Sequence, residues 1–502
     1  MNKLAQLDHR YLWHPFTQMR DWLKREPILI TRGAGAVLWD AHDRQYLDAN
    51  ASIWTNLHGH NHPKINRAIQ RQLRKIAHSS ALGLANEPAS LLAEKLVQAA
   101  NPNPPRSRLR EEADHVDWSS EQSNSASSQR RLQKVFLSDD GSTAMEVALK
   151  LAYEYARRTG RSQKPRFLSL EGAYHGDTVG AVSLGHIDLF HKAYAGLLFK
   201  TDKVMAPYCY RCPFNRAKPE RADARECRKC HWECVSLVEK KFAAQKKKGN
   251  PYAAMVIEPL IQGAAGMIPQ PQGWLRQVAE IARSHGAQLI ADEVMTAFGR
   301  VGQPASHASR LTPHASTLFG CHHEGVQPDF LALAKGLTGG YLPLAATLTT
   351  QAVFEAFLGD YSEFKTFFHG HSFTGNQLGC AAALASLEIL QNPASNRARQ
   401  KLEHTLREEL SALWSLPNIG DVRQVGLIAG VELVKEWRTR APFELREQAG
   451  IRVCEAMARR GVLTRPIGNV IVLMPPYCTT PEQVAQMVQA LREAVREVLA
   501  KI

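Results

Sequence analysis

The middle of the chain alternates between short apolar runs and longer stretches of helical periodicity. In SDDGSTAMEVALKLAYEYAR, residues 138–157, apolar side chains recur three and four positions apart, which is the spacing of an amphipathic helix. The apolar runs have the length of buried strands and span residues 134–137, 166–170, 252–259, 287–294 and 330–334. Strands that alternate with helices in this way are typical of a mostly parallel sheet, so we predict an α/β fold.

Beyond residue 376 helices and strands no longer alternate regularly. The predicted elements are a helix at 396–413, a strand at 426–433, a helix at 446–460, strands through 462–474 and a last helix from 481. A chain of 502 residues exceeds the size of one compact core. We therefore expect a large domain at 76–375, a small α+β domain at 376–502, and an N-terminal segment, 1–75, that joins the small domain.

Two segments of the large domain differ in composition from their surroundings. Residues 101–131 contain PNPPRSRLREE and SSEQSNSASSQ, which offer little apolar surface to bury, and we interpret them as a disordered insertion without chemistry. Residues 205–248 form a cysteine-rich, basic insertion. Between 200 and 248 the chain has 14 Lys and Arg against 6 Asp and Glu, a surplus of 8 within a formal net charge of +14. This local surplus favours a basic surface loop over a nucleic-acid-binding protein.

Four cysteines of the insertion have the spacing of a zinc ribbon. They are Cys209, Cys212, Cys227 and Cys230, two C-x2-C pairs with 14 residues between them. A structural zinc ion bound by these thiolates would order a polar loop that has little core of its own. His231 and Cys234 lie near enough in sequence to compete as ligands. The same feature supports a zinc-ribbon nucleic-acid binder as an alternative, but that alternative leaves the α/β pattern unexplained.

The sequence carries no signal for export or for a membrane. No window reaches the roughly 18 consecutive apolar residues of a membrane span, and the N-terminal stretch MNKLAQLDHRYLWHPFTQM lacks the apolar core of a signal peptide. Nine cysteines in such a chain do not indicate a disulfide framework. We expect a cytoplasmic protein that binds neither membranes nor nucleic acid.

Polar residues stand at the ends of three consecutive apolar runs. These residues are Glu258, Asp292 and Lys335. Because ligands of parallel sheets bind beyond the carboxyl ends of the strands, we expect the three to share a site. A lysine held there loses hydration, so its amine is easier to deprotonate and becomes nucleophilic. A lone lysine after a strand is otherwise most often a surface residue, so the interpretation depends on its partners.

Two further features complete a site for pyridoxal phosphate. Gly141 and Ser142 begin a helix that follows a strand. The free N–H groups and the dipole at the start of a helix can bind a phosphate group. The same residues are also found in an ordinary helix cap that binds no ligand. Tyr174 lies in a loop after a strand, from which its ring can stack on an aromatic ligand. Lys335 would form the Schiff base, and Asp292 would keep the pyridinium nitrogen protonated, so that the ring acts as an electron sink. The sequence therefore predicts a pyridoxal phosphate enzyme.

Several motifs resemble those of one family. DEVMTAFGR begins at Asp292, 43 residues before Lys335, and SDDGSTAMEVALK and YHGDT precede it, as in the class III, fold-type I aminotransferases. Within that family the chain is similar to the branch that acts on 8-amino-7-oxononanoate in biotin biosynthesis. The motifs that carry this similarity are LWHPFTQM, HGHNHP, IEPLIQGAAGM, KGLTGGYLPLAATLTT, FFHGHSFTGN and LTRPIGNVIVLMPPY. The resemblance extends over nearly the whole chain outside the two insertions.

The resemblance implies a role for each matching residue. Lys335 would carry the Schiff base and move a proton as general base and acid, and Asp292 would pair with the pyridine nitrogen. The other cofactor-binding residues would be Gly141, Ser142, Tyr174 and, from the partner subunit of a homodimer, His371 and Ser372. The substrate-binding residues would be Phe16, Trp54, Tyr174, Gly370 and Arg465, with Arg465 holding a carboxylate. Glu258 and Arg300 also match and would have supporting roles.

For this branch the resemblance implies transfer of an amino group to 8-amino-7-oxononanoate, which gives 7,8-diaminononanoate, with S-adenosylmethionine as the donor. Three departures resemble relatives in which lysine is the donor, and they keep that alternative open. Phe16 replaces a tyrosine, Ile53-Trp54 replaces a tandem tryptophan, and Gly370-His371-Ser372 replaces Gly-Pro-Thr. Another ω-aminotransferase or an aminomutase is the remaining alternative among enzymes.

Overall fold

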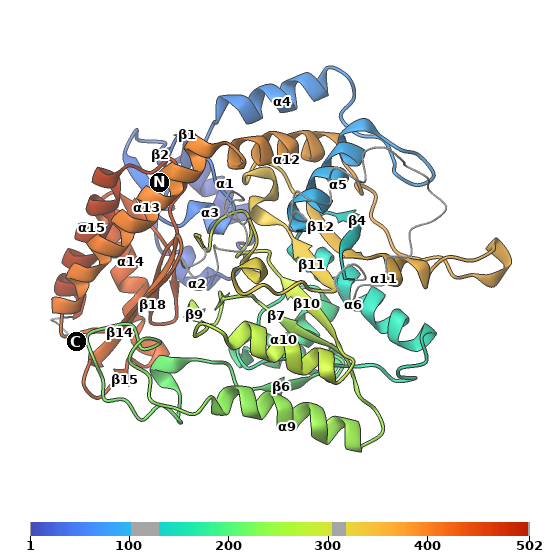
Figure 1. The fold of residues 1–502 in the computed structure, drawn as a ribbon. Helices are drawn as coiled ribbons and strands as arrows, with labels where there is room; N and C mark the ends of the chain where they lie inside the picture. Colours follow the sequence, from blue (N-terminus) through green and yellow to red (C-terminus); the bar gives the residue numbers. More distant parts are fainter. Residues whose placement is uncertain (1, 102–129, 304–317, 500–502) are drawn as a thin grey trace.

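The computed structural model describes residues 2–101, 130–303 and 318–499. A large unit surrounds a seven-stranded sheet, and a small unit built from the end of the chain lies beside it (Figure 1). Most of the predicted disordered insertion, 101–131, lies outside the described residues. Within the described ranges no helix has the length and apolar character that a membrane crossing requires.

The central sheet is parallel except for one strand. Its order is β4 (Leu132–Ser138), β12 (Ala345–Thr350), β11 (Phe330–Leu333), β10 (Gln288–Asp292), β7 (Tyr252–Ile257), β5 (Arg166–Leu170) and β6 (Asp202–Val204). Only β12 runs against its neighbours. All residues of β7, β10, β11 and β12 are buried, which is why most of these strands appear in the sequence as uninterrupted apolar runs.

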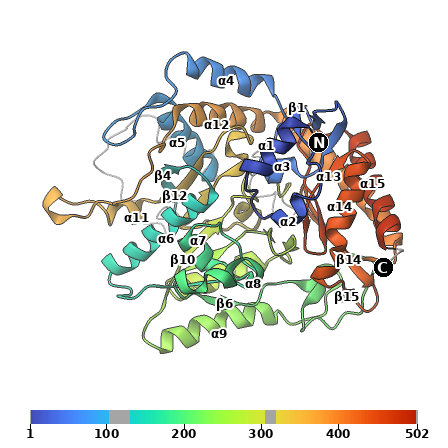
Figure 2. The ribbon, with the colours of Figure 1, turned by 180° about the vertical axis from the view of Figure 1, so that it is seen from behind.

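Helices cover both faces of this sheet. On one face lie α5 (Glu87–Ala100), α9 (Glu233–Lys247), α10 (Trp274–Ser284) and α12 (Gln377–Leu390); on the other lie α6 (Gly141–Arg158) and α7 (Val179–Leu184) (Figures 1 and 2). The alternation along a strand assigns the faces: Leu289 and Ala291 pack with the first group, and Ile290 packs with the second. The α/β prediction for this part of the chain is confirmed.

The small unit is an antiparallel sheet covered by helices. It contains β13 (Ile419–Val425), β14 (Ile428–Glu436), β18 (Val470–Leu473), β17 (Pro466–Ile467) and β15 (Ala441–Pro442), with α13 (Pro393–Ser411), α14 (Ala449–Arg459) and α15 (Pro481–Leu499). The N-terminal segment joins it through a second sheet of β1 (Ile30–Ala34), β2 (Val37–Asp40), β3 (Gln45–Asp48) and β16 (Val462–Leu463). Leu47 and Ala49 belong to the core of the small unit.

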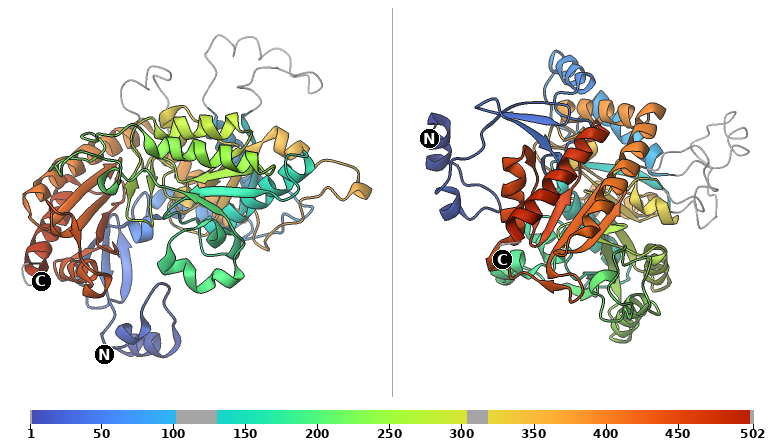
Figure 3. Two further views of the ribbon diagram at one scale, coloured as in Figure 1. Left: turned by 90° about the horizontal axis from the view of Figure 1, so that it is seen from below. Right: turned by 90° about the vertical axis from the view of Figure 1, so that its left-hand side faces the viewer.

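The remaining elements of the described chain are short or peripheral. They include α1 (Lys3–Tyr11), α2 (Met19–Trp22), α3 (Ala51–Trp54), α4 (Pro63–Leu73), α8 (Asp188–His191), α11 (Gln351–Glu355), β8 (Ile261–Gln262) and β9 (Ile268–Pro269). Helices α1 and α2 project from the body of the chain (Figure 3). The domain boundary at residue 376 stays a prediction, because α12, just beyond it, packs Cys380 and Leu387 into the core of the large sheet.

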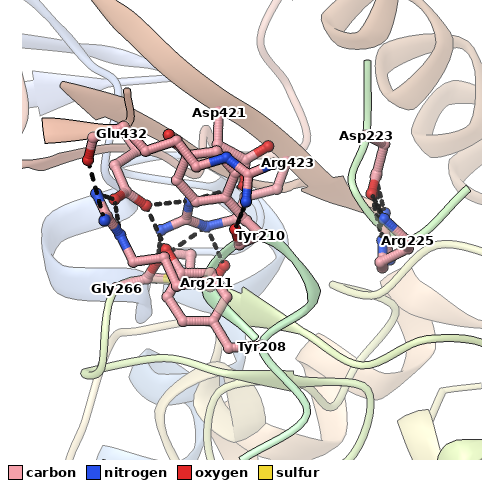
Figure 4. A network of polar contacts seen from close by, with 11 residues as sticks. Tyr208, Tyr210, Arg211, Asp223, Arg225, Gly266, Asp421, Arg423 and Glu432 are labelled. Atoms are coloured by element: carbon pink, nitrogen blue, oxygen red, sulfur yellow. Dashed lines mark hydrogen bonds and ion pairs between the residues drawn. The ribbon is translucent and has the colours of Figure 1, made fainter. Parts of the chain in front are cut away.

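The cysteine-rich insertion at 205–248 is more ordered than a surface loop. Its last part forms α9, whose Val238 and Phe242 are buried in the main core, so the expected loop is wrong there. The apolar spacing of this helix is masked in the sequence by the lysines that surround it. Its first part binds the small unit: Tyr208 and Arg211 donate to the Glu432 carboxylate (Figure 4).

A buried arginine connects this contact to the rest of the small unit. Arg423 is 1% exposed and pairs with Asp421 at 2.9 Å and with Glu432 at 2.7 Å. It also donates to the carbonyl oxygens of Gly266 and Met267, in the loop between β8 and β9 (Figure 4). Burial raises the pKa of Asp421 to about 6, and the charge of Arg423 opposes that shift. Arg423, with Arg211 as a second partner of Glu432, therefore compensates two buried carboxylates at the junction of the two units.

Replacing this arginine is expected to destabilise the protein strongly. Arg423→Ala leaves Asp421 buried without an ion-pair partner among the described residues and leaves Glu432 with Arg211 alone, a change that costs roughly 3–5 kcal/mol in comparable sites. The midpoint of urea unfolding, followed by circular dichroism, should fall accordingly. Arg438→Ala is the matched control, because Arg438 pairs with Glu436 at 3.4 Å on the surface and its loss should change stability by about 1 kcal/mol at most. Equal midpoints for the two variants would contradict the role of the network.

Candidate active site

The carboxyl ends of five parallel strands meet around one cavity of about 420 Å³. Its lining includes Trp54, Gly141, Ser142, Tyr174, His175, Glu258, Asp292 and Lys335. These side chains come from loops that follow β4, β5, β7, β10 and β11, with Trp54 added from the N-terminal segment. The structure thus brings together the residues that the sequence predicted at the strand ends.

Lys335 lies at the base of this cavity, two residues after β11. Its backbone has φ 43°, a left-handed conformation that a side chain other than glycine rarely adopts. Burial lowers the pKa of its amine, and the nearby carboxylates of Asp292 and Glu258 oppose that shift. The ring of Trp54 lies over the amine, with Nζ 4.7 Å from the ring centroid. Burial makes the neutral, nucleophilic form of Lys335 easier to reach.

Asp292, the last residue of β10, is held by two hydrogen bonds. Its Oδ2 lies 2.7 Å from Nδ1 of His175, and its Oδ1 accepts from the Val294 N–H at 3.1 Å. An ionised carboxylate can only accept, so His175 donates from Nδ1. Nε2 of His175 is buried and has no partner among the described residues. These bonds fix the Asp292 carboxylate in the wall of the cavity.

Glu258 reaches the cavity from the neighbouring strand. Its Oε2 accepts from the Gly263 N–H at 2.8 Å, and its Oε1 is buried with no partner in the described part of the chain. Burial raises the pKa of Glu258 to about 7; His175 opposes the shift, and the negative charge of Asp292 adds to it. This carboxyl group therefore changes its charge near neutral pH.

The start of α6 forms the part of the site that suits a phosphate. Gly141 and Ser142 are its first two residues, and the helix is 18 residues long, so its N-terminus carries the full helix dipole. The loop after β5 approaches this turn very closely. A Cβ atom on Gly176, which has φ 121°, would lie 2.3 Å from the Ser142 Oγ. Only glycine allows this approach, a requirement that the sequence pattern did not reveal.

Tyr174 forms the side of the cavity. Its hydroxyl donates to Asp177 at 2.6 Å, and its ring stacks against His191 with 6.3 Å between centroids. Burial and the hydrogen bond to Asp177 raise the pKa of Tyr174, so the phenol stays neutral. Phe16 lies further out, edge-on to Phe190, which in turn contacts Tyr174. The predicted Phe16 is therefore connected to the site without lining the cavity.

Other predicted residues lie outside the cavity of this single chain. Gly370 and Ser372 are exposed, and His371 pairs through Nδ1 with Asp139, which lines the cavity, at 3.1 Å. Arg465 is exposed between β16 and β17 and forms no hydrogen bond or ion pair with the described residues. Arg300 is fully buried and donates to the carbonyl oxygens of Pro475 and Asn56, so its supporting role is to join distant segments.

The segment that carries Trp54 has an unusual backbone. In α3 the four residues Ala51–Trp54 have φ values of 44°, 48°, 66° and 69°, so this turn is left-handed. Such a turn costs L-residues about 1–2 kcal/mol each, or roughly 4–8 kcal/mol in total. Surrounding contacts must hold it in place, as is typical of strained segments at functional sites.

The cysteines are arranged differently from the predicted zinc ribbon. Cys209, Cys212, Cys230 and Cys234 line a small cavity of about 10 Å³, and Cys227 is not among its lining residues. Burial raises the pKa of the Cys209 thiol to about 12 and that of the Cys234 thiol to about 11. Among the described residues no group of three or more His, Cys, Asp or Glu is placed to hold a metal ion. The zinc-ribbon hypothesis therefore finds no support in this geometry.

The main cavity fits pyridoxal phosphate. A poorly hydrated lysine can bind the cofactor covalently, the carboxylate of Asp292 can pair with its ring nitrogen, the start of α6 can bind its phosphate, and Tyr174 can cover its ring. The unpaired polar atoms of His175 and Glu258 at the same wall are consistent with a polar ligand in this space.

The chain belongs to the class III aminotransferases, which are enzymes that depend on pyridoxal phosphate. The family model described as Aminotransferase class-III matches residues 19–495. Among curated relatives, the adenosylmethionine-8-amino-7-oxononanoate aminotransferase of Geobacter sulfurreducens is 44% identical and covers 99% of this chain and 98% of its own. The enzyme of the same name from Aquifex aeolicus is 41% identical and covers 98% and 97%.

Solved structures agree with this assignment. The adenosylmethionine-8-amino-7-oxononanoate aminotransferase of Methanocaldococcus jannaschii superimposes with a TM-score of 0.83 at 38% identity, over 99% of both chains. An amine transaminase from an uncultivated Pseudomonas species, solved with bound pyridoxal phosphate, gives 0.81 at 31% identity over 97% and 99%. The predicted fold type and enzyme class are confirmed.

Lys335→Ala is expected to abolish amino transfer. The alanine variant has no amine to bind the cofactor or to move a proton, so the visible absorption of the bound cofactor should vanish, and turnover should fall by at least about a hundred-fold. Lys95→Ala, at an exposed position on α5, is the control and should leave both unchanged. Turnover of the Lys335 variant at the wild-type rate would refute the assignment.

The raised pKa of Glu258 leads to a prediction about how the stability of the cofactor-free protein depends on pH. The pKa of Glu258 is about 7 in the folded chain against an ordinary value of 4.5, so the folded state binds more protons between these values. The contribution of Glu258 to stability is therefore fully present below about pH 4.5 and is lost as pH rises through about 7, by an amount on the order of 3 kcal/mol.

Glu258→Gln tests this directly. Urea unfolding of the variant should be less sensitive to pH between about 4.5 and 7 than that of the wild type. Glu408→Gln, on the exposed surface of α13, should keep the wild-type profile. Identical profiles for Glu258→Gln and the wild type would show that Glu258 is not the titrating group.

Proposed function

We propose that this enzyme transfers an amino group to 8-amino-7-oxononanoate to form 7,8-diaminononanoate in the biotin pathway, with S-adenosylmethionine as donor. The observation that carries the proposal is the similarity, over nearly the whole of both chains, to relatives that bear the name of this reaction. We place the enzyme in the cytoplasm, where its small-molecule substrates are made.

The residues of the cavity have distinct tasks in such a reaction. When bound, pyridoxal phosphate withdraws electrons from the substrate carbon that loses its proton. Lys335 takes up that proton at Nζ and returns it, a task for which its lowered pKa is suited. Asp292 holds the ring nitrogen, and the start of α6 holds the phosphate. Trp54 covers Nζ of Lys335 and limits the water that reaches it.

We assign substrate recognition to the outer residues. Arg465 has no anionic partner within the described chain and can bind a substrate carboxylate with its two-pronged guanidinium group. Trp54 lines the cavity and Phe16 lies further out against Phe190, so both offer aromatic surfaces to an aliphatic substrate. Gly370 would lie against the substrate without a side chain to obstruct it.

We propose that the enzyme works as a homodimer. The segment after α11 extends away from the body (Figures 1 and 2) and exposes Phe364, Phe368 and Phe373, while Leu82 is 91% exposed. Apolar side chains grouped in this way mark an interaction surface. This arrangement would carry His371 and Ser372 to the phosphate of the partner subunit, which explains why a single chain leaves Ser372 in solvent.

Lysine is the second candidate donor, and Phe16 is the observation that favours it. Phe16 lacks the hydroxyl group of the tyrosine that many relatives have at this position. A donor that reaches this residue would therefore meet a more apolar surface than it meets in those relatives. An ω-aminotransferase with another acceptor is the further alternative, because amine transaminases share the fold.

The donor can be identified in a half-reaction. Purified enzyme is mixed with S-adenosylmethionine or with lysine, and the visible absorption of the bound cofactor is followed as the amino group is transferred. We expect S-adenosylmethionine to abolish this absorption and 8-amino-7-oxononanoate to restore it. A response to lysine alone would change the donor but keep the acceptor. No response to either donor would refute the biotin-pathway assignment and leave the enzyme class in place.

A further inference from the structure

The left-handed turn at Ala51–Trp54 is built without a glycine. Four successive side chains, including the β-branched Ile53 at φ 66° and ψ 50°, occupy a conformation that glycine alone adopts freely. Ile53 is 42% exposed and Ser52 is also exposed, so burial of these side chains does not hold the turn. Another interaction must hold it.

That interaction is the carboxylate of Asp48, at the end of β3. Its Oδ1 accepts from the backbone N–H of Ser52 at 3.0 Å and from that of Asn50 at 3.3 Å. Its Oδ2 accepts from the Ser52 hydroxyl at 2.8 Å and lies 3.0 Å from Nε2 of His60. Asp48 is 3% exposed. Burial alone would raise its pKa, but the bonds from His60 and Ser52 outweigh burial and lower it, so the group is a carboxylate.

The histidine is itself oriented so that it donates to Asp48. The Asn56 side chain accepts from the Gly59 N–H through Oδ1 at 2.9 Å, which fixes its amide nitrogen toward Nδ1 of His60, also at 2.9 Å. Nδ1 therefore accepts, and the proton of a neutral imidazole lies on Nε2, facing Asp48. All four donors around the Asp48 carboxylate are thus supplied by the segment that follows it.

The turn fixes the position of Trp54. Its indole Nε1 donates to Oδ1 of Asn50 at 2.8 Å, and its ring lies 4.7 Å from Nζ of Lys335. A Cβ on Gly263 would lie 3.5 Å from the Trp54 ring, which is an ordinary van der Waals distance, so the backbone at Gly263 borders the ring. Asp48 also pairs with Leu463 in the parallel β3–β16 contact, two residues before Arg465. Asp48 therefore lies next to two features of the site: the turn that carries Trp54 and the strand that leads to Arg465.

We propose that Asp48 is a positioning residue for amino transfer. Its carboxylate holds the left-handed turn, and the turn holds the Trp54 ring over Lys335, so that water and small nucleophiles have restricted access to the bound cofactor. The inference rests on the aminotransferase class of the chain and on no particular donor or acceptor, so failure of the proposed substrate would leave it intact.

Asp48→Asn is the first test, because it preserves shape but leaves one acceptor oxygen where four donors converge. We expect hydroxylamine to remove the visible absorption of the bound cofactor about ten- to a hundred-fold faster than in the wild type, and kcat/KM to fall by a similar factor. Asp43→Asn, an exposed aspartate in the neighbouring turn, is the matched control and should behave as the wild type. Unchanged hydroxylamine reactivity in a folded Asp48→Asn variant would overturn the proposal.

A double-mutant cycle tests whether Asp48 acts through Trp54. Trp54→Ala alone should increase hydroxylamine reactivity, and adding Asp48→Asn should change it less than about two-fold further, because the ring that Asp48 positions is already gone. A general structural role of Asp48 would instead give the full additional increase. Additive effects would overturn the proposal.

A rescue experiment covers the case in which Asp48→Asn is poorly folded. Ile53→Gly removes the strain at one of the four left-handed residues, the β-branched one, and Ile53 is 42% exposed, so the change loses only part of a buried side chain. Asp48→Asn/Ile53→Gly should recover thermal stability and most of the protection from hydroxylamine. Recovery of thermal stability without recovery of protection would show that Asp48 supports the fold but does not position Trp54, and would overturn the proposal.

Discussion

The constraint on which this structure depends is a lysine amine that must be poorly hydrated and yet lie beside carboxylates. A parallel sheet solves this because β11 ends two residues before Lys335, while β10 ends at Asp292 and β7 ends one residue before Glu258. Helices on both faces exclude water from the strands, so the amine loses hydration without a polar loop around it. The left-handed backbone at Lys335 then turns the chain sharply into the cavity. The cofactor site is therefore a consequence of where the strands end.

Much of this arrangement could be predicted because burial on both faces leaves a strong signal. The strands that carry Asp292 and Lys335 are continuous apolar runs, and a charged residue directly after such a run is conspicuous. β12 was missed because its three threonines read as polar, although Thr347 satisfies its hydroxyl through the Ala144 carbonyl oxygen inside the core. Zinc-ribbon spacing was misleading for a related reason: spacing along the chain does not show that Cys234, and not Cys227, faces the other three thiols.

Other features have no signature in a single sequence. The turn at Ala51–Trp54 contains ordinary L-residues, and its left-handed conformation follows from the Asp48 carboxylate and the packing around Trp54. Arg465 and Ser372 are exposed in the single chain, and the roles that we propose for them require a substrate and a second subunit, which a single sequence does not position. The connection between the insertion and the small unit depends on Arg423, whose partners lie far away in sequence.

Two carboxylates reach the cavity, and their surroundings are the reason that we propose Asp292, and not Glu258, as the partner of the cofactor's ring nitrogen. Two donors, Nδ1 of His175 and the Val294 N–H, face Asp292 and hold its carboxylate in place. Glu258 receives one donor and lies where burial brings its pKa to about 7, so near neutral pH a large share of it is uncharged. An anion is needed to hold a proton on the ring nitrogen, and the two donors that position the Asp292 carboxylate suit it to the role that we propose for it. Glu258 is better suited to limit the negative charge next to Asp292, because protonating it removes the repulsion between the two groups.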